Sequence, residues 1–138
     1  MKKKSQHRNQ FGQWYWHEPI YRNNFALLCC PANQAADRLR LVLPEDVCAE
    51  CDPIFKELNC EGRFICTRYD TSGLFVVFWL KSSADVPVIV HEAFHAVWYF
   101  LRDKGLKLSE DSEEAYTYML EWLMREILTR RSELKVHP

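Results

Sequence analysis

Apolar residues fall into short runs in the first half of the chain and into longer, helix-like stretches after residue 85. Residues 63–69 and 74–80 are rich in β-branched and aromatic residues, and the four residues between them end in glycine. This pattern predicts a β-hairpin. Its second arm is apolar on both faces, as expected of a strand buried between two layers. Residues 14–16 and 25–30 are two further apolar runs, which we interpret as short strands.

Two short helices are predicted between these strands. One spans residues 34–43 and is stopped by Pro44. The other begins at Asp52-Pro53, which suit an N-cap and the first helical position, and runs to Leu58.

Two longer helices follow the hairpin. The first begins after the loop 82–85, with Asp85 or a neighbouring serine as its cap and Pro87 in its first turn, and ends before Gly105. Residues 86–101 are so largely apolar that we expect this helix to be buried on all sides. The second spans about residues 112–130 and has one apolar side. Strands followed by helices predict an α+β fold with a small antiparallel sheet.

The first long helix carries the motif His91-Glu92-Ala93-Phe94-His95. Residues four apart lie on the same helix face, so His91 and His95 can bind one metal ion. Glu92 can reach a water molecule bound to that metal, which is the arrangement of zinc hydrolases. Alternatively, both histidines are ordinary helix residues facing a polar pocket. A buried helix rarely carries His, Glu and His in one turn without a partner, which favours the metal site.

A catalytic zinc site needs a third protein ligand. The second long helix starts near a run of acidic residues, and two helices joined by a short loop pack as antiparallel neighbours. We predict Glu114 as the ligand, with Glu113 as the alternative. A third possibility is that neither binds metal, because acidic residues in a first turn favour the helix dipole and Asp111-x-x-Glu114 resembles a capping box.

Length and charge narrow the functional classes. A chain of 138 residues, 48% of them hydrophobic, predicts one globular domain, which we place at residues 13–138. A net charge of −1 gives no case for nucleic-acid binding by this domain. Residues 1–12 are basic and polar, so we expect a flexible tail, with a weak nucleic-acid or membrane-surface contact as the alternative. We see no signal peptide and no membrane-spanning segment, and therefore expect a soluble cytoplasmic protein.

All six cysteines lie in the first half of the chain. Cys48 and Cys51 form a C-x-x-C pair, which could make a structural zinc knuckle with Cys60 and Cys66. The spacing of the second pair does not suit a zinc ribbon, so small core residues are the competing interpretation. Disulfides are not expected in a cytosolic chain.

The motif, eighteen intervening residues and then Glu114-Ala115-Tyr116 resemble the gluzincin branch of the zincin metallopeptidases. The layout is also similar to small zincin-like proteins encoded by bacteriophages and prophages. The resemblance covers residues 90–127, about a quarter of the chain. It implies a zincin-like domain and a peptide or protein substrate. It also implies that the strand 74–80, if it lies at an edge of the sheet, pairs with the extended substrate.

These observations predict a zinc-dependent metallopeptidase in which Glu92 is the general base. Tyr118, one turn after Glu114, is a candidate for stabilising the oxyanion, with His17 and His137 as alternatives and ordinary packing or surface roles competing. A zinc-binding structural or interaction protein on the same scaffold is the alternative function.

Overall fold

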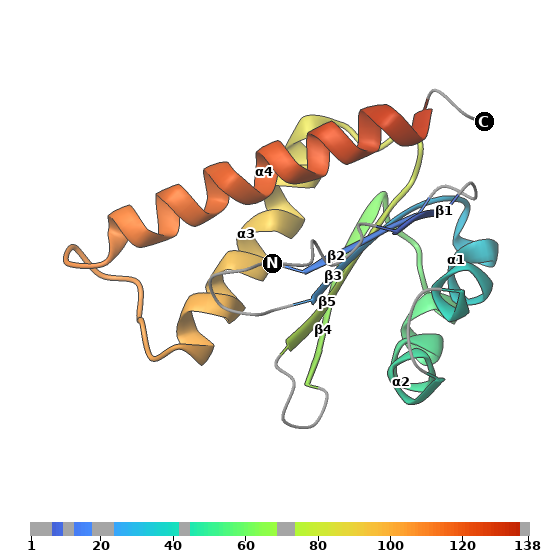
Figure 1. The fold of residues 1–138 in the computed structure, drawn as a ribbon, viewed down its shortest axis with the longest axis horizontal. Helices are drawn as coiled ribbons and strands as arrows, with labels where there is room; N and C mark the ends of the chain where they lie inside the picture. The colour runs from blue at the N-terminus through green and yellow to red at the C-terminus, as the bar shows by residue number, and fades with distance from the viewer. Residues whose placement is uncertain (1–6, 10–12, 18–23, 42–44, 69–73, 136–138) are drawn as a thin grey trace.

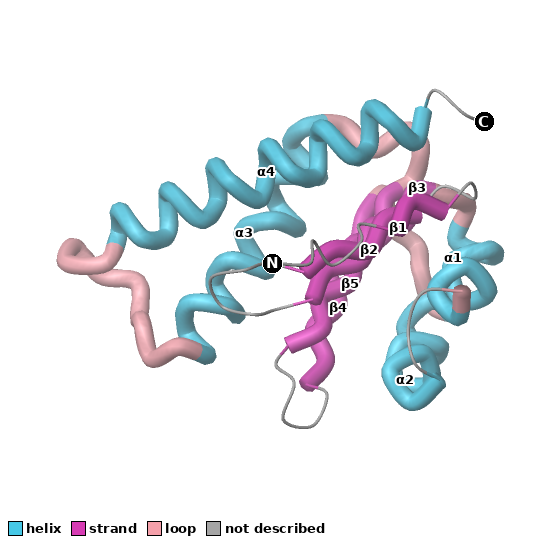
Figure 2. Tube along the Cα trace, in the orientation of Figure 1, coloured by secondary structure: helices cyan, strands magenta, loops and turns pink. Residues whose placement is uncertain are grey.

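The computed structural model describes residues 7–9, 13–17, 24–41, 45–68 and 74–135. This part of the chain forms one mixed sheet with helices on both faces (Figures 1 and 2), which confirms the α+β class. The strands are β1 (His7–Asn9), β2 (Gln13–His17), β3 (Asn24–Cys29), β4 (Gly62–Arg68) and β5 (Leu74–Leu80). The helices are α1 (Ala32–Arg40), α2 (Glu45–Lys56), α3 (Val86–Asp103) and α4 (Glu113–Lys135).

The strands lie in the order β1-β2-β3-β5-β4. The predicted hairpin is confirmed, because β4 pairs with β5 in antiparallel register with Ile65 opposite Val77; its turn lies outside the described residues. The prediction of an entirely antiparallel sheet is wrong, because β3 and β5 are parallel, with Ala26 opposite Val77. After β3 the chain forms α1 and α2 and then β4, which is not adjacent to β3 in the sheet. β5 follows β4 and lies between β3 and β4. A strand in this position is covered on both faces, which explains why β5 is apolar throughout.

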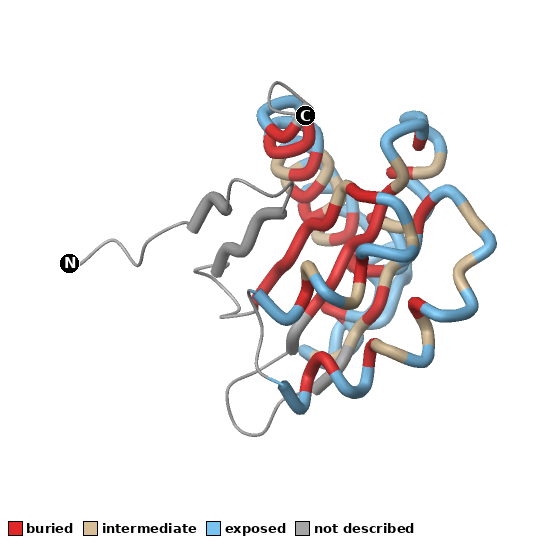
Figure 3. Tube along the Cα trace, turned by 90° about the vertical axis from the view of Figure 1, so that its right-hand side faces the viewer, coloured by how far each residue is buried: buried red, intermediate tan, exposed pale blue. Residues whose placement is uncertain are grey.

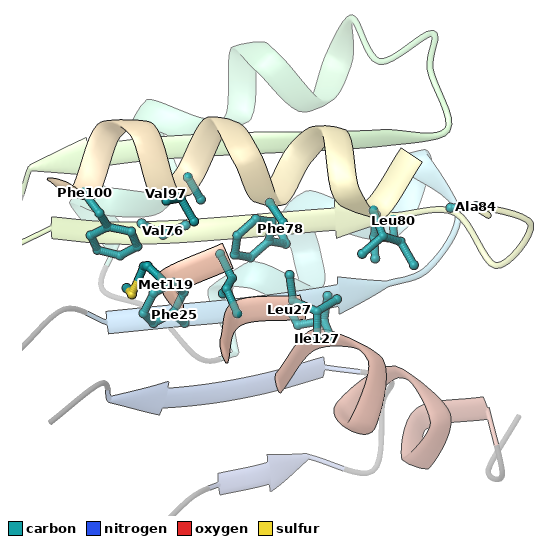
Figure 4. Packing of buried hydrophobic residues seen from close by; sticks show 14 of the residues in the cluster. Phe25, Leu27, Val76, Phe78, Leu80, Ala84, Val97, Phe100, Met119 and Ile127 are labelled. Atoms are coloured by element: carbon teal, nitrogen blue, oxygen red, sulfur yellow. The ribbon is translucent and has the colours of Figure 1, made fainter. Parts of the chain in front are cut away.

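Two hydrophobic clusters lie on opposite faces of the sheet, because alternate residues of a strand point to opposite sides. Phe25, Leu27, Val76, Phe78 and Leu80 face α3 and α4, as Figure 4 shows. Their neighbours Ala26, Leu28, Val77 and Trp79 face α1 and α2. Figure 3 shows the buried residues gathered along the described part of the sheet and on the inner sides of the helices. The helix pair α3 and α4 therefore owes its position to the first cluster.

The predicted ends of α3 are confirmed. The Asp85 side chain accepts a hydrogen bond from the Val88 backbone N–H at 3.2 Å, and Pro87 lies in the first turn. Gly105 follows the helix with φ of 82°, a conformation that favours glycine, and the Leu106 N–H donates to the Leu101 carbonyl at 2.8 Å. The expectation that α3 is buried on all sides is wrong: Phe94 is 43% exposed. The sheet and α4 cover only part of its circumference.

Several boundaries differ from the predictions. The Asp52-Pro53 start predicted for α2 is wrong, because the helix begins at Glu45 and Pro53 lies inside it. Val47, Cys48, Cys51 and Phe55 are buried on the side of α2 that packs on the sheet, and this contact begins well before Pro53. Strand β1 lies within residues 1–12, which we expected to form a tail, and pairs with β2. Among the described helices, none is both long enough and apolar enough to span a lipid bilayer.

Candidate metal centre

His91 and His95 lie one turn apart on α3, and their side chains converge. The two Nε2 atoms are 3.2 Å apart, and the rings meet edge to face with centroids 4.7 Å apart. Two imidazole nitrogens bound to a tetrahedral zinc, each about 2.0–2.1 Å from the metal, lie about 3.3 Å apart. The observed spacing fits that span. Both histidines are exposed, so a metal ion can reach them from solvent. The same distance also suits a hydrogen bond between the two rings, so metal binding by this pair stays a prediction.

Glu92, next to His91 on α3, contacts the edge strand of the sheet. Its Oε2 atom accepts a hydrogen bond from the Phe64 backbone N–H on β4 at 2.7 Å. Close approach of α3 to β4 makes this bond possible: a Cβ atom added at Gly62 would lie 2.8 Å from Val88 Cγ1 and 3.4 Å from Glu92 Cγ. Only glycine leaves room for the helix here. The Glu92 carboxylate is thus held beside the edge of the sheet by one of its two oxygens.

A cavity of about 370 Å³ opens between α3 and β4. It is lined by Ile54, Arg63, Phe64, Ile65, Cys66, His91, Glu92, His95 and Tyr99. The strand that borders it is β4, which lies at the edge of the sheet, whereas β5 lies between β3 and β4. The expectation that residues 74–80 form the substrate-pairing edge is therefore wrong. β4, the first arm of the hairpin, pairs with the outer side of β5. The first arm therefore forms the edge of the sheet, and the second arm does not.

Tyr99 lines this cavity, although the sequence analysis did not single it out. Positions 91, 95 and 99 are each four residues apart, so all three lie on one face of α3. That periodicity was the signal that could have identified the tyrosine. The Tyr99 ring packs against Phe64 with centroids 5.5 Å apart, and Phe64 in turn stacks beside His95 at 6.4 Å. One aromatic wall thus supports both the histidine and the tyrosine.

The structure does not bring Glu113 or Glu114 to the histidines. Among the described residues, no three His, Cys, Asp or Glu side chains lie close enough together to hold a metal ion. Glu114 is exposed in the first turn of α4, whereas Tyr116, two residues later, is buried and its hydroxyl donates to the Leu106 carbonyl at 2.9 Å. Residues two apart point to nearly opposite sides of a helix. Packing of Tyr116 therefore turns Glu114 outward, and its role as a ligand stays a prediction.

Of the tyrosine and histidine candidates for the oxyanion, the structure describes the side chain of Tyr118 alone. Tyr118 is 65% exposed, on the same outward side of α4 as Glu114, and does not line the cavity. The His17 backbone belongs to β2, but its side chain lies outside the described residues, as does all of His137. Tyr118 was selected because it lies one turn after Glu114, the predicted ligand. Glu114 itself faces solvent, and a residue one turn later on the same side of the helix faces solvent too.

The cysteines do not form the predicted zinc knuckle within the described residues. Cys48 and Cys51 are buried between α2 and the sheet, while Cys60 and Cys66 are partly buried after α2 and on β4. All six cysteines are described, and none forms a disulfide. Burial raises the pKa of Cys48, and it raises that of Cys51 to about 12, with smaller contributions from Cys48 and nearby acidic groups. Both are therefore protonated thiols at neutral pH and behave as small core residues.

Comparison with known proteins gives no relative on which to base a function. No model of a protein family, no curated protein and no solved structure matches the chain.

Proposed function

We propose that this protein is a zinc-dependent hydrolase that cleaves peptide bonds at the cavity between α3 and β4. The observation that carries the proposal is the convergence of two imidazole nitrogens on one turn of α3, in a cavity that Glu92 also lines. The Nε2 atoms of His91 and His95 lie 3.2 Å apart, and the Glu92 carboxylate accepts a hydrogen bond from the Phe64 N–H on β4. His91 and His95 would hold the zinc, although no third protein ligand lies beside them among the described residues, and the metal would supply Lewis acidity, which makes a water molecule more acidic and a carbonyl carbon more electrophilic.

Glu92 is suited to move the protons of the reaction. Its Oε2 accepts the Phe64 N–H, which restrains the carboxylate at the cavity, and its Oε1 can accept a proton. Hydrolysis forms a bond between the water oxygen and the carbonyl carbon and breaks the C–N bond. Glu92 takes a proton from the water and gives it to the leaving amine nitrogen. The enzyme residue is thus regenerated at the end of each cycle.

An extended peptide is the substrate that the border of the cavity favours. The Lys81 N–H donates to the Glu61 carbonyl at 2.9 Å, so the peptide groups of Glu61 point toward β5. This direction alternates along an antiparallel strand, and the peptide groups of Gly62 and of every second residue after it therefore point away from β5. Glu92 occupies the N–H of Phe64, and by the same alternation the peptide groups of Arg68 also point outward along the edge. A peptide can add to such an edge through main-chain hydrogen bonds.

A non-catalytic zinc-binding protein is the second candidate. The contact between Glu92 and Phe64 favours it, because the glutamate then has a structural use that requires no chemistry. The two candidates share the histidine pair and differ only in whether Glu92 acts on a substrate.

Zinc content and peptide cleavage, measured on the same preparations, separate the candidates. We would compare the wild type with Glu92→Gln and His95→Ala, using casein and a peptide library. Glutamine keeps an oxygen that can accept the Phe64 N–H but cannot serve as the base. The peptidase proposal expects Glu92→Gln to retain zinc and lose cleavage, and His95→Ala to lose both. Zinc binding by a wild type that cleaves no peptide supports the second candidate, and absence of zinc contradicts both.

A further inference from the structure

We infer that the end of α2 and the start of β4 form a specificity pocket, which takes an apolar side chain of a peptide bound along the edge of the sheet. This inference rests on the peptide-binding edge of the proposed function, but it requires neither zinc nor cleavage. It concerns a second cavity of about 340 Å³, which is lined by Ile54, Glu57, Leu58, Asn59, Cys60 and Arg63.

The two cavities lie around the same strand. Ile54 and Arg63 line both of them. Phe64 packs against the hydrophobic cluster on the α3 side, whereas Ile65 belongs to the cluster on the α2 side. Arg63 shares the face of Ile65, because every second residue of a strand points to the same side. Figure 1 shows α3 and α2 on opposite sides of β4, so the edge strand has a cavity on each face.

A peptide that adds to β4 would reach both cavities. Side chains directly opposite one another on paired strands lie on the same face, and successive side chains alternate between the faces. A peptide residue opposite Phe64 therefore points to the α3 side, and a residue opposite Arg63 or Ile65 points to the α2 side. Every peptide bond of the added strand joins one residue of each kind. Whichever bond lies at Glu92, one of its two flanking residues faces the side that carries the second cavity.

The lining of the second cavity favours an apolar side chain. Ile54, Leu58 and Cys60 are partly buried and pack against the hydrophobic cluster on the α2 side. The formal charges of Glu57 and Arg63 cancel among the six lining residues, so they give no preference for a charged side chain. A volume of about 340 Å³ is at the lower end of the range of about 300–1,000 Å³ for small-ligand pockets, and so suits one side chain. We therefore expect leucine, methionine or phenylalanine at this position of the peptide.

Peptide binding to the metal-free protein tests the pocket separately from catalysis. We would screen a library of short capped peptides for binding by fluorescence anisotropy in the presence of EDTA. Each apolar residue of the tightest-binding peptide, the parent peptide, would then be replaced by alanine in turn. At one position this replacement should weaken binding at least about tenfold, because apolar pockets discriminate to this extent between side chains that differ by a methylene group or more.

Cysteine labelling of the wild type assigns that position to the second cavity. Cys60 lines the second cavity but not the first, and Cys66 lines the first but not the second. At saturating concentrations the parent peptide should protect both thiols from iodoacetamide, whereas the alanine peptide should protect Cys66 alone. Leu58→Trp, which should fill the pocket, should weaken binding of the parent peptide to the level of the alanine peptide. Leu41→Trp is the matched control, because Leu41 is 59% exposed after α1 and lines neither cavity.

The outcomes separate the pocket from the function on which it rests. Protection of Cys60 by the parent peptide but not by the alanine peptide supports the pocket, even if no peptide is cleaved and the hydrolase proposal fails. This result decides the matter even if Leu58→Trp does not fold. Equal binding of all alanine-substituted peptides, or labelling of Cys60 at the same rate with and without the parent peptide, would overturn the pocket and leave the hydrolase proposal standing. A protein that neither binds nor cleaves any peptide overturns both proposals.

Discussion

Adding a single methyl group at Gly62 should push α3 away from β4, the edge strand of the sheet. In Gly62→Ala the new Cβ would meet Val88 Cγ1 at 2.8 Å and Leu80 Cδ2 at 3.0 Å. The leucine terminus can rotate away, but a β-branched valine in a helix has essentially one χ1 rotamer, so the helix itself must move. Overpacking of this kind costs about 1–3 kcal/mol. We expect that loss in the free energy of unfolding measured by urea denaturation.

A double-mutant cycle tests whether the Val88 contact is the cause. Val88→Ala removes the methyl group that the new Cβ would meet, so Gly62→Ala should cost less in that background, with a coupling of about 1 kcal/mol. Gly105→Ala is the matched comparison, because its Cβ meets nothing within 4 Å and its cost of about 1–2 kcal/mol comes from a φ of 82°. It should be insensitive to Val88. If Gly62→Ala costs the same in both backgrounds, or nothing, the reasoning about close approach is refuted.

Three further predictions concern the site and the core. Glu92→Ala should speed hydrogen exchange of the Phe64 amide about tenfold, whereas Glu92→Gln should not. Hydrogen bonds to charged groups contribute about 1.5–3 kcal/mol, and this one is partly exposed. Equal exchange rates in the wild type and both variants would contradict the anchoring role of Glu92. Because Glu114 faces solvent, Glu114→Gln and Glu113→Gln should both bind zinc as tightly as the wild type, as measured by competition with a chromophoric chelator; weaker binding in Glu114→Gln alone would contradict the outward position of this side chain. Iodoacetamide at pH 8 should label partly buried Cys60 before buried Cys51, because a pKa of about 12 leaves almost no thiolate at Cys51. Mass spectrometry of partly labelled protein measures the order, and labelling of Cys51 first would contradict this prediction.

The elements around the motif could be predicted because each has a local cause in the sequence. Asp85, Pro87 and Gly105 define the ends of α3 through a side-chain cap, a preset φ and a positive φ. The run of β-branched and aromatic residues in β4 and the turn residues after it predict the hairpin. Convergence of His91 and His95 follows from a spacing of four residues on any α-helix.

Long-range arrangement was harder to predict. β3 and β5 pair in parallel because α1, α2 and β4 lie between them in the chain and determine where β5 enters the sheet. The residues of β5 alone carry no information about this path. The face of α4 that packs inward is set by Tyr116 and its bond to Leu106, and that choice turns Glu114 outward. The spacing between the motif and Glu114 measures distance along the chain but not rotation about the helix. Tyr99, in contrast, was accessible to sequence reasoning, because the same four-residue spacing extends from His95.

The central claim is that His91 and His95 bind zinc, and the zinc X-ray absorption spectrum tests it most directly. For the wild type loaded with about one zinc ion per chain, we expect only nitrogen and oxygen neighbours at about 2.0–2.1 Å, with the multiple scattering of two imidazole rings. His95→Ala should remove this signal. Sulfur neighbours at about 2.3 Å would place the metal on the cysteines instead. That result, or a failure to take up zinc, would contradict the account.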